Sequence, residues 1–165
     1  RGFDVHGVDI SEAFVDIART GAPDGVTFEV MDARSMSFAG EFDLVLSVCQ
    51  GAFGMSGGPA AGTTLDPDRE ILEGMARAVK RSGRVVFTAF NAYLQVANMA
   101  DGNDFDAERG VHRETTEVLN RAGAAKMCET VGLTVESMTA ATPGDWSERR
   151  PTAEDVEHLV IAARA

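Results

Sequence analysis

Apolar residues along the chain fall into short runs of strand length, separated by stretches in which they recur at helical spacing. The runs that predict strands occupy residues 5–9, 26–31, 42–49, 84–90, 133–141 and 157–164. The stretches that predict helices occupy residues 11–20, 66–83 and 121–132. This alternation is typical of an α/β protein with a Rossmann-like, doubly wound and mostly parallel sheet. The run FDLVLSVC at residues 42–49 is almost continuously apolar, which predicts a central strand buried on both faces.

Capping residues mark the ends of the predicted helices. Ser11 can cap the first helix, which Gly21 then ends. Asp66 and Pro67 give the second helix an N-cap and a proline at its first position. That helix carries an apolar stripe and has a basic, glycine-terminated end at residues 80–83.

Two segments lack the regular pattern. Residues 50–64 contain five glycines and follow a predicted buried strand, which indicates a loop that can close over a site. Residues 91–120 predict a substrate or lid insertion within a single domain of residues 1–165. The acidic stretch DGNDFDAERG at residues 101–110 lacks the glycine of a calcium-binding loop, so we expect a solvated loop and no metal site.

The charge balance narrows the choice of partners. With 26 acidic and 15 basic residues the chain carries a formal charge of −11, which disfavours nucleic acid and favours a small neutral or cationic molecule. Its apolar runs are too short to cross a membrane. Cys49 and Cys128 lie far apart and have no CxxC spacing, which is typical of reduced thiols in a cytoplasmic protein.

Three segments in this order resemble a class I S-adenosylmethionine-dependent methyltransferase: VHGVDISEAF, FEVMDARSMSFAGEFDLVLSVCQGAFG and ILEGMARAVKRSGRVVFTAF. Together they cover about half of the chain. The resemblance implies a three-layer sandwich around a seven-stranded sheet, whose antiparallel last strand is inserted beside the strand before it. It also implies methyl transfer from S-adenosylmethionine to a small molecule.

The resemblance further implies which residues hold the cofactor. Asp9 would bind the ribose hydroxyls, and Ile10 would pack on the adenine. Asp32 would accept a hydrogen bond from the adenine amino group, beside the Ala33 amide. The residues expected at the methionine end are Ser47, Cys49 and Gln50.

The acceptor side is less well defined by the sequence. Phe53 and Met55 are the large apolar residues of the glycine-rich loop, and Tyr93 and His112 follow the neighbouring strand, so these four are the candidate substrate contacts. His112 or Tyr93 could act as a base, although a lone exposed histidine is usually an ordinary surface residue. His6 and His158 lie inside predicted strands, where a structural role is expected.

Two departures from the family pattern lead to further expectations. No glycine-rich strand and turn precede residue 1, so we expect the N-terminal part of the fold to be missing and the first strand to have an open edge. A second missing segment is expected between Asn120 and Arg121. An NAD(P)-dependent oxidoreductase remains an alternative, although Ala97 stands where its short-chain form has lysine after Tyr93. A non-catalytic binding or dimerisation module is another, and a homodimer is compatible with either.

Overall fold

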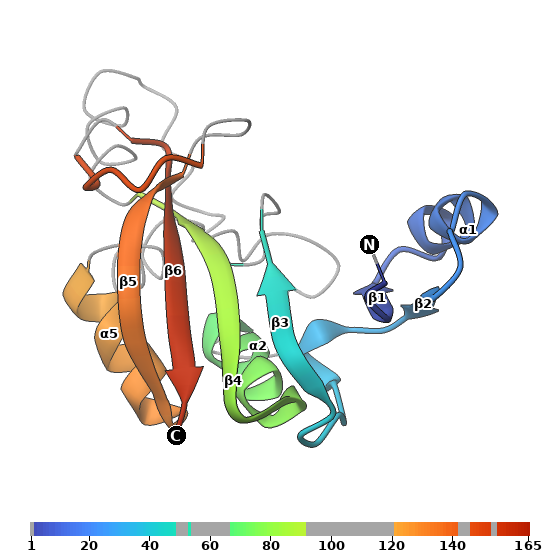
Figure 1. The fold of residues 1–165 in the computed structure, drawn as a ribbon, viewed down its shortest axis with the longest axis horizontal. Helices are drawn as coiled ribbons and strands as arrows, with labels where there is room; N and C mark the ends of the chain where they lie inside the picture. Colours follow the sequence, from blue (N-terminus) through green and yellow to red (C-terminus); the bar gives the residue numbers. More distant parts are fainter. Residues whose placement is uncertain (1, 49–52, 54–66, 92–120, 142–145, 153–154) are drawn as a thin grey trace, which may run out of the picture.

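The computed structural model describes residues 2–48, 53, 67–91, 121–141, 146–152 and 155–165 (Figure 1). Strands β1 (Val5–Asp9) and β2 (Val26–Val30) form a parallel pair. A four-stranded sheet has the order β3-β4-β6-β5. Its strands are β3 (Phe42–Ser47), β4 (Val79–Phe90), β5 (Leu133–Ala141) and β6 (Glu157–Arg164). The helices are α1 (Glu12–Thr20), the 3-10 helix η1 (Ala33–Ser35), α2 (Pro67–Ala78) and α5 (Arg121–Thr130).

The strand directions confirm the Rossmann-like prediction. β3 runs parallel to β4, whereas β6 is antiparallel to both β4 and β5 and lies between them. The last strand is therefore inserted beside the strand that precedes it in the chain. β1 pairs with β2 alone among the described strands.

The hydrophobic core lies between the four-stranded sheet and helices α2 and α5 (Figure 1). Leu72 and Met75 of α2 are buried against Phe87 of β4, and α5 packs on β5 through its apolar side. The predicted stripes of both helices are thus confirmed as core. Burial raises the pKa of the Cys128 thiol on α5 to about 11, so this cysteine stays protonated at neutral pH.

The prediction that residues 42–49 form a strand buried on both faces is wrong. The strand ends at Ser47, and Leu44 and Leu46 are 49% and 57% exposed. β3 is an edge strand of the four-stranded sheet, paired only with β4 among the described residues. Its apolar sequence is that of an interior strand, but burial depends on which neighbours pair with it, and composition does not report that.

The predicted end of the second helix is also wrong. α2 ends at Ala78, and Val79 already pairs with Phe42 as the first residue of β4. The left-handed residue after the helix is Ser82, with φ of 62°. Gly83 is needed for a different reason, because a Cβ there would lie 2.8 Å from the Asp43 carbonyl oxygen. A close backbone contact therefore accounts for this glycine.

Helix α1 begins as predicted but buries a different residue. The Ser11 side chain caps it by accepting a hydrogen bond from the Phe14 amide. Phe14 and Ile17 of the predicted apolar stripe are exposed, whereas Val15 is buried. Trp146 is half exposed in the connection between β5 and β6. No helix among the described residues is long and apolar enough to span a membrane.

Candidate active site

The candidate cofactor residues follow the carboxyl ends of the parallel strands. Asp9 is the last residue of β1, Asp32 and Ala33 follow β2, and Ser47 is the last residue of β3. In open α/β sheets this edge is where ligands bind, because loops diverge there and leave a crevice.

The Asp9 carboxylate is partly engaged at the start of α1. Its Oδ1 atom accepts a hydrogen bond of 2.7 Å from the Ser11 amide. Its Oδ2 atom has no hydrogen-bond partner among the described residues, and the side chain is exposed. The next residue, Ile10, leaves 55% of its surface exposed. One free carboxylate oxygen thus stands beside an uncovered apolar side chain.

Asp32 is held by a residue that the sequence reasoning missed. The Arg34 guanidinium contacts both carboxylate oxygens, with Nε at 2.9 Å from Oδ1 and Nη2 bonded to Oδ2. The Arg34 amide also donates to Oδ1 at 3.0 Å. These hydrogen bonds hold the pKa of Asp32 below its usual value and raise that of Arg34. The spacing of two residues in DAR is the signal that could have revealed this pair.

The Ala33 amide donates to no acceptor among the described residues, because it is the first amide of η1. Ser47 is buried at the end of β3. Phe53 lies in the core, with its ring centroid 4.7 Å from that of Phe87. Five further predicted site residues lie outside the described residues: Cys49, Gln50, Met55, Tyr93 and His112.

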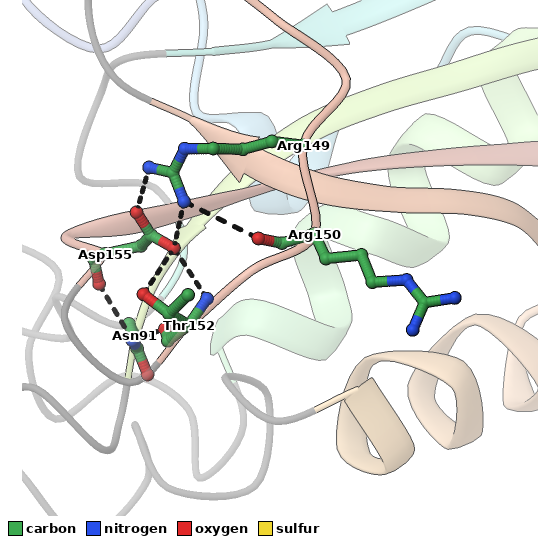
Figure 2. A network of polar contacts seen from close by, with 5 residues as sticks. All are labelled: Asn91, Arg149, Arg150, Thr152 and Asp155. Carbon is green, nitrogen blue, oxygen red and sulfur yellow. Dashed lines mark hydrogen bonds and ion pairs between the residues drawn. The ribbon is translucent and has the colours of Figure 1, made fainter.

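A polar network closes the same edge of the sheet beyond β4 (Figure 2). The Asp155 carboxylate accepts hydrogen bonds from Nη1 and Nη2 of Arg149 and, at 2.6 Å, from the Thr152 amide. The buried Asn91, directly after β4, donates from Nδ2 to the Asp155 carbonyl at 2.8 Å and to the Thr152 carbonyl at 3.0 Å. The network ties the end of β4 to the segment that enters β6. No sequence motif indicated it.

One carboxylate oxygen at this edge is buried without a hydrogen bond. Glu157 is the first residue of β6, opposite Phe90 of β4, and its Oε2 atom has no partner among the described residues. A buried acceptor of this kind can receive a proton or hold a cationic group. His6 instead bonds through Nδ1 to Thr27 Oγ1 at 2.8 Å and packs against Phe38, which fits the expected structural role.

Comparison with known proteins identifies the family to which the chain belongs. The family described as the methyltransferase domain matches residues 1–83, which is more than half of the 165 residues. The chain belongs to the methyltransferase-domain family. Its cofactor is S-adenosylmethionine, and it is an S-adenosylmethionine-dependent methyltransferase. The oxidoreductase and the non-catalytic module are thereby set aside. No curated protein matches the chain.

Solved structures with this fold agree with the family assignment. A TehB-like methyltransferase from Corynebacterium glutamicum is 19% identical with a TM-score of 0.61, and the match covers 99% of this chain and 70% of that one. The CcbJ methyltransferase from Streptomyces caelestis is 16% identical with a TM-score of 0.69, over 98% and 75%. Magnesium protoporphyrin IX methyltransferase from Synechocystis, solved with bound S-adenosylhomocysteine, is 16% identical with a TM-score of 0.60, over 97% and 64%. These similarities show the fold.

Most of the residues at the edge fit the methyltransferase cofactor, and one needs a rearrangement. The free Oδ2 of Asp9, the exposed Ile10 side chain and the unbonded Ala33 amide match the groups of adenosine. Asp32 has its acceptor positions filled by Arg34, so an adenine amino group would have to displace one of these hydrogen bonds.

We therefore expect Arg34→Gln to tighten S-adenosylmethionine binding by about threefold, because a neutral amide competes less strongly for the Asp32 carboxylate. Isothermal titration calorimetry on the full-length protein measures this. Arg150→Gln is the matched control, since it removes the same charge from a side chain without an ion pair among the described residues. Weaker binding in Arg34→Gln than in the control would show that Arg34 supports the cofactor instead of competing with it.

Proposed function

We propose that the protein methylates a small neutral or cationic molecule, with the cofactor held at the carboxyl ends of β1, β2 and β3. The observation that carries the proposal is the group formed by Asp9, Ile10 and Ala33. It offers an acceptor for ribose hydroxyls, an apolar surface for the adenine and a donor for a ring nitrogen. Asp32 would also contact the adenine, once the Arg34 guanidinium has released one of the carboxylate oxygens. Ser47, Cys49 and Gln50 are proposed at the methionine end.

Bound S-adenosylmethionine would supply an electrophilic methyl group on a sulfonium: as the acceptor forms its bond to the methyl carbon, the carbon–sulfur bond breaks and S-adenosylhomocysteine leaves as a neutral thioether. The residues of the chain therefore have to align the acceptor and exclude water, and a protein nucleophile is unnecessary. A base is required only where the acceptor atom must lose a proton. Tyr93 and His112 are proposed as acceptor contacts from the sequence, with Met55 from the preceding loop. Phe53 is only 1% exposed and packs on Phe87 in the core, so it is not proposed to contact the acceptor. The Glu157 carboxylate, whose Oε2 atom has no hydrogen-bond partner among the described residues, is proposed as the base for an acceptor that must lose a proton.

Charge and chemistry support a small acceptor. The formal charge of −11 opposes the approach of a nucleic acid. The buried oxygen of Glu157 favours an amine or another group that can donate a hydrogen bond. One protein of similar fold is named for a small acceptor, magnesium protoporphyrin IX.

The test incubates the full-length protein with methyl-labelled S-adenosylmethionine and separate pools of amines, phenols and carboxylic acids, and with an oligonucleotide and a protein mixture. We expect S-adenosylhomocysteine to form with a small-molecule pool, most readily with the amines. Product formation only with the oligonucleotide or the protein mixture would contradict the proposed acceptor class. Failure to bind S-adenosylmethionine by calorimetry would contradict the proposed cofactor residues.

A further inference from the structure

A cleft of about 540 Å³ opens at the opposite end of the four-stranded sheet from the cofactor edge. The start of β4 and the end of β6 lie together at this end, away from the carboxyl end of β3 (Figure 1). The residues that line the cleft are Ala39, Gly40, Arg77, Lys80, Arg81 and Arg164. Four of the 15 basic residues of an acidic chain therefore meet in one place.

Most of the positive charge in the cleft is not neutralised by carboxylates. Lys80 pairs with Asp43 at 2.9 Å, but Asp43 is 88% exposed, so solvent screens this pair. Glu41 follows the lining residues Ala39 and Gly40, and its Oε1 atom accepts a hydrogen bond of 3.1 Å from the Ala39 amide. Among the described residues, the side chains of Arg77 and Arg164 donate hydrogen bonds to main-chain carbonyls and to no carboxylate. Arg81 makes no side-chain hydrogen bond or ion pair among the described residues.

Capping of helix α2 explains only part of this cluster. Basic residues are often found where a helix ends, since they complement the dipole and bond to the last carbonyls. Here the Arg77 carbonyl accepts from the Gly40 amide and from Arg164, and the Ala78 carbonyl accepts from the Glu41 amide. These carbonyls at the end of α2 therefore have hydrogen-bond donors without Arg81 or Lys80. Helix capping therefore does not account for Arg81, and Lys80 is engaged only in the solvent-screened pair with Asp43.

We propose that this cleft binds a small molecule that carries two or more phosphate groups. Guanidinium groups recognise phosphate oxygens through paired hydrogen bonds, and Arg77, Arg81 and Arg164 retain donors for this purpose. The cleft has the volume of a site for a small ligand. A long polyanion would meet the repulsion of the −11 charge over the rest of the surface, which a compact ligand largely avoids.

The test titrates the full-length protein with tripolyphosphate and follows heat of binding and thermal unfolding. We expect saturable binding and a higher Tm, with affinity reduced about fivefold in Arg81→Gln and further in Lys80→Gln/Arg81→Gln. Arg81 has no side-chain hydrogen bond or ion pair to lose among the described residues, so its substitution should leave the fold intact. Arg150→Gln removes the same charge from the segment that enters β6, which lies at the other end of this strand from the cleft, and should leave the affinity unchanged within about twofold (Figure 1).

Three results would overturn the proposal. The first is the absence of saturable tripolyphosphate binding, and the second is equal weakening by Arg81→Gln and Arg150→Gln, which would indicate diffuse attraction. The third is tighter binding of a short oligothymidylate than of tripolyphosphate, which would assign the cleft to nucleic acid. S-adenosylmethionine affinity, measured in parallel, should be the same in wild type and Arg81→Gln, so the outcome is independent of the methyl-transfer site.

Discussion

Asp155→Ala is expected to lower the free energy of unfolding by about 2–3 kcal/mol, the largest stability change among the polar residues discussed. The Asp155 side chain is 7% exposed, and its carboxylate accepts bonds from Arg149, the Thr152 amide and the Thr152 hydroxyl. Removing it leaves the Thr152 amide without its acceptor and releases the turn that Asn91 binds (Figure 2). Urea unfolding monitored by circular dichroism measures the change.

Two variants separate the network from a general charge effect. Asp16→Ala removes a carboxylate from an exposed pair with Arg19, and it should cost no more than about 0.5 kcal/mol. Asp155→Asn preserves the shape of the side chain and can still accept from the Thr152 amide, so its loss should be intermediate. Equal stability of Asp155→Ala and Asp16→Ala would show that the contacts in Figure 2 contribute nothing.

The same residue predicts how stability depends on pH. Hydrogen bonds from Arg149, and then from Thr152, hold the pKa of Asp155 well below its usual range. A carboxyl in the unfolded chain titrates near ~3.9, so the stabilisation is complete above about pH 5 and declines as the pH falls toward the lower folded-state pKa. The difference in stability between wild type and Asp155→Asn should therefore shrink below about pH 4.

Local patterns in the sequence predicted much of the fold. The predicted bounds of β1, β5 and β6 match the structure at both ends, because alternation and flanking turns mark a strand locally. The end of α2 could not be located in this way. Ser82 adopts a left-handed conformation there, and the pairing of Val79 with Phe42 joins segments 37 positions apart. Pairing of that kind is a tertiary effect, and no helix-end signal reports it.

The candidate site residues show the same contrast between local patterns, which the sequence reveals, and contacts of distant segments, which it does not. The positions of Asp9 and Asp32 at this edge of the sheet were predictable, because Asp9 ends a recognisable strand and Asp32 follows one within two residues. The Asp32–Arg34 pair could have been predicted from the sequence, because its two residues are only two positions apart. Asn91 and Asp155 are 64 positions apart, and nothing in either local sequence indicates that they meet. The cleft basic residues Arg77 and Arg164 are likewise brought together only by folding, 87 positions apart.

Asp9→Ala is expected to weaken S-adenosylmethionine binding by about 1–3 kcal/mol, or about fivefold to 150-fold in Kd. The proposed reason is that Oδ2, which has no partner among the described residues, accepts the ribose hydroxyls. Because Oδ1 also accepts from the Ser11 amide at the start of α1, alanine removes a structural hydrogen bond as well. Calorimetry on the full-length protein therefore needs a variant that separates the two effects.

Asp9→Asn supplies that separation. Its amide oxygen can still accept from the Ser11 amide, so α1 should begin normally and the Tm should stay near that of wild type. Its amide nitrogen cannot accept from a hydroxyl, so cofactor affinity should fall nearly as far as in Asp9→Ala. Asp16→Asn is the control for the loss of one negative charge near a cationic cofactor. Asp16 lies on helix α1, directly after β1, in the exposed pair with Arg19. If Asp9→Asn binds S-adenosylmethionine as tightly as Asp16→Asn does, the carboxylate at the end of β1 does not hold the ribose, and the proposed cofactor site loses its main contact.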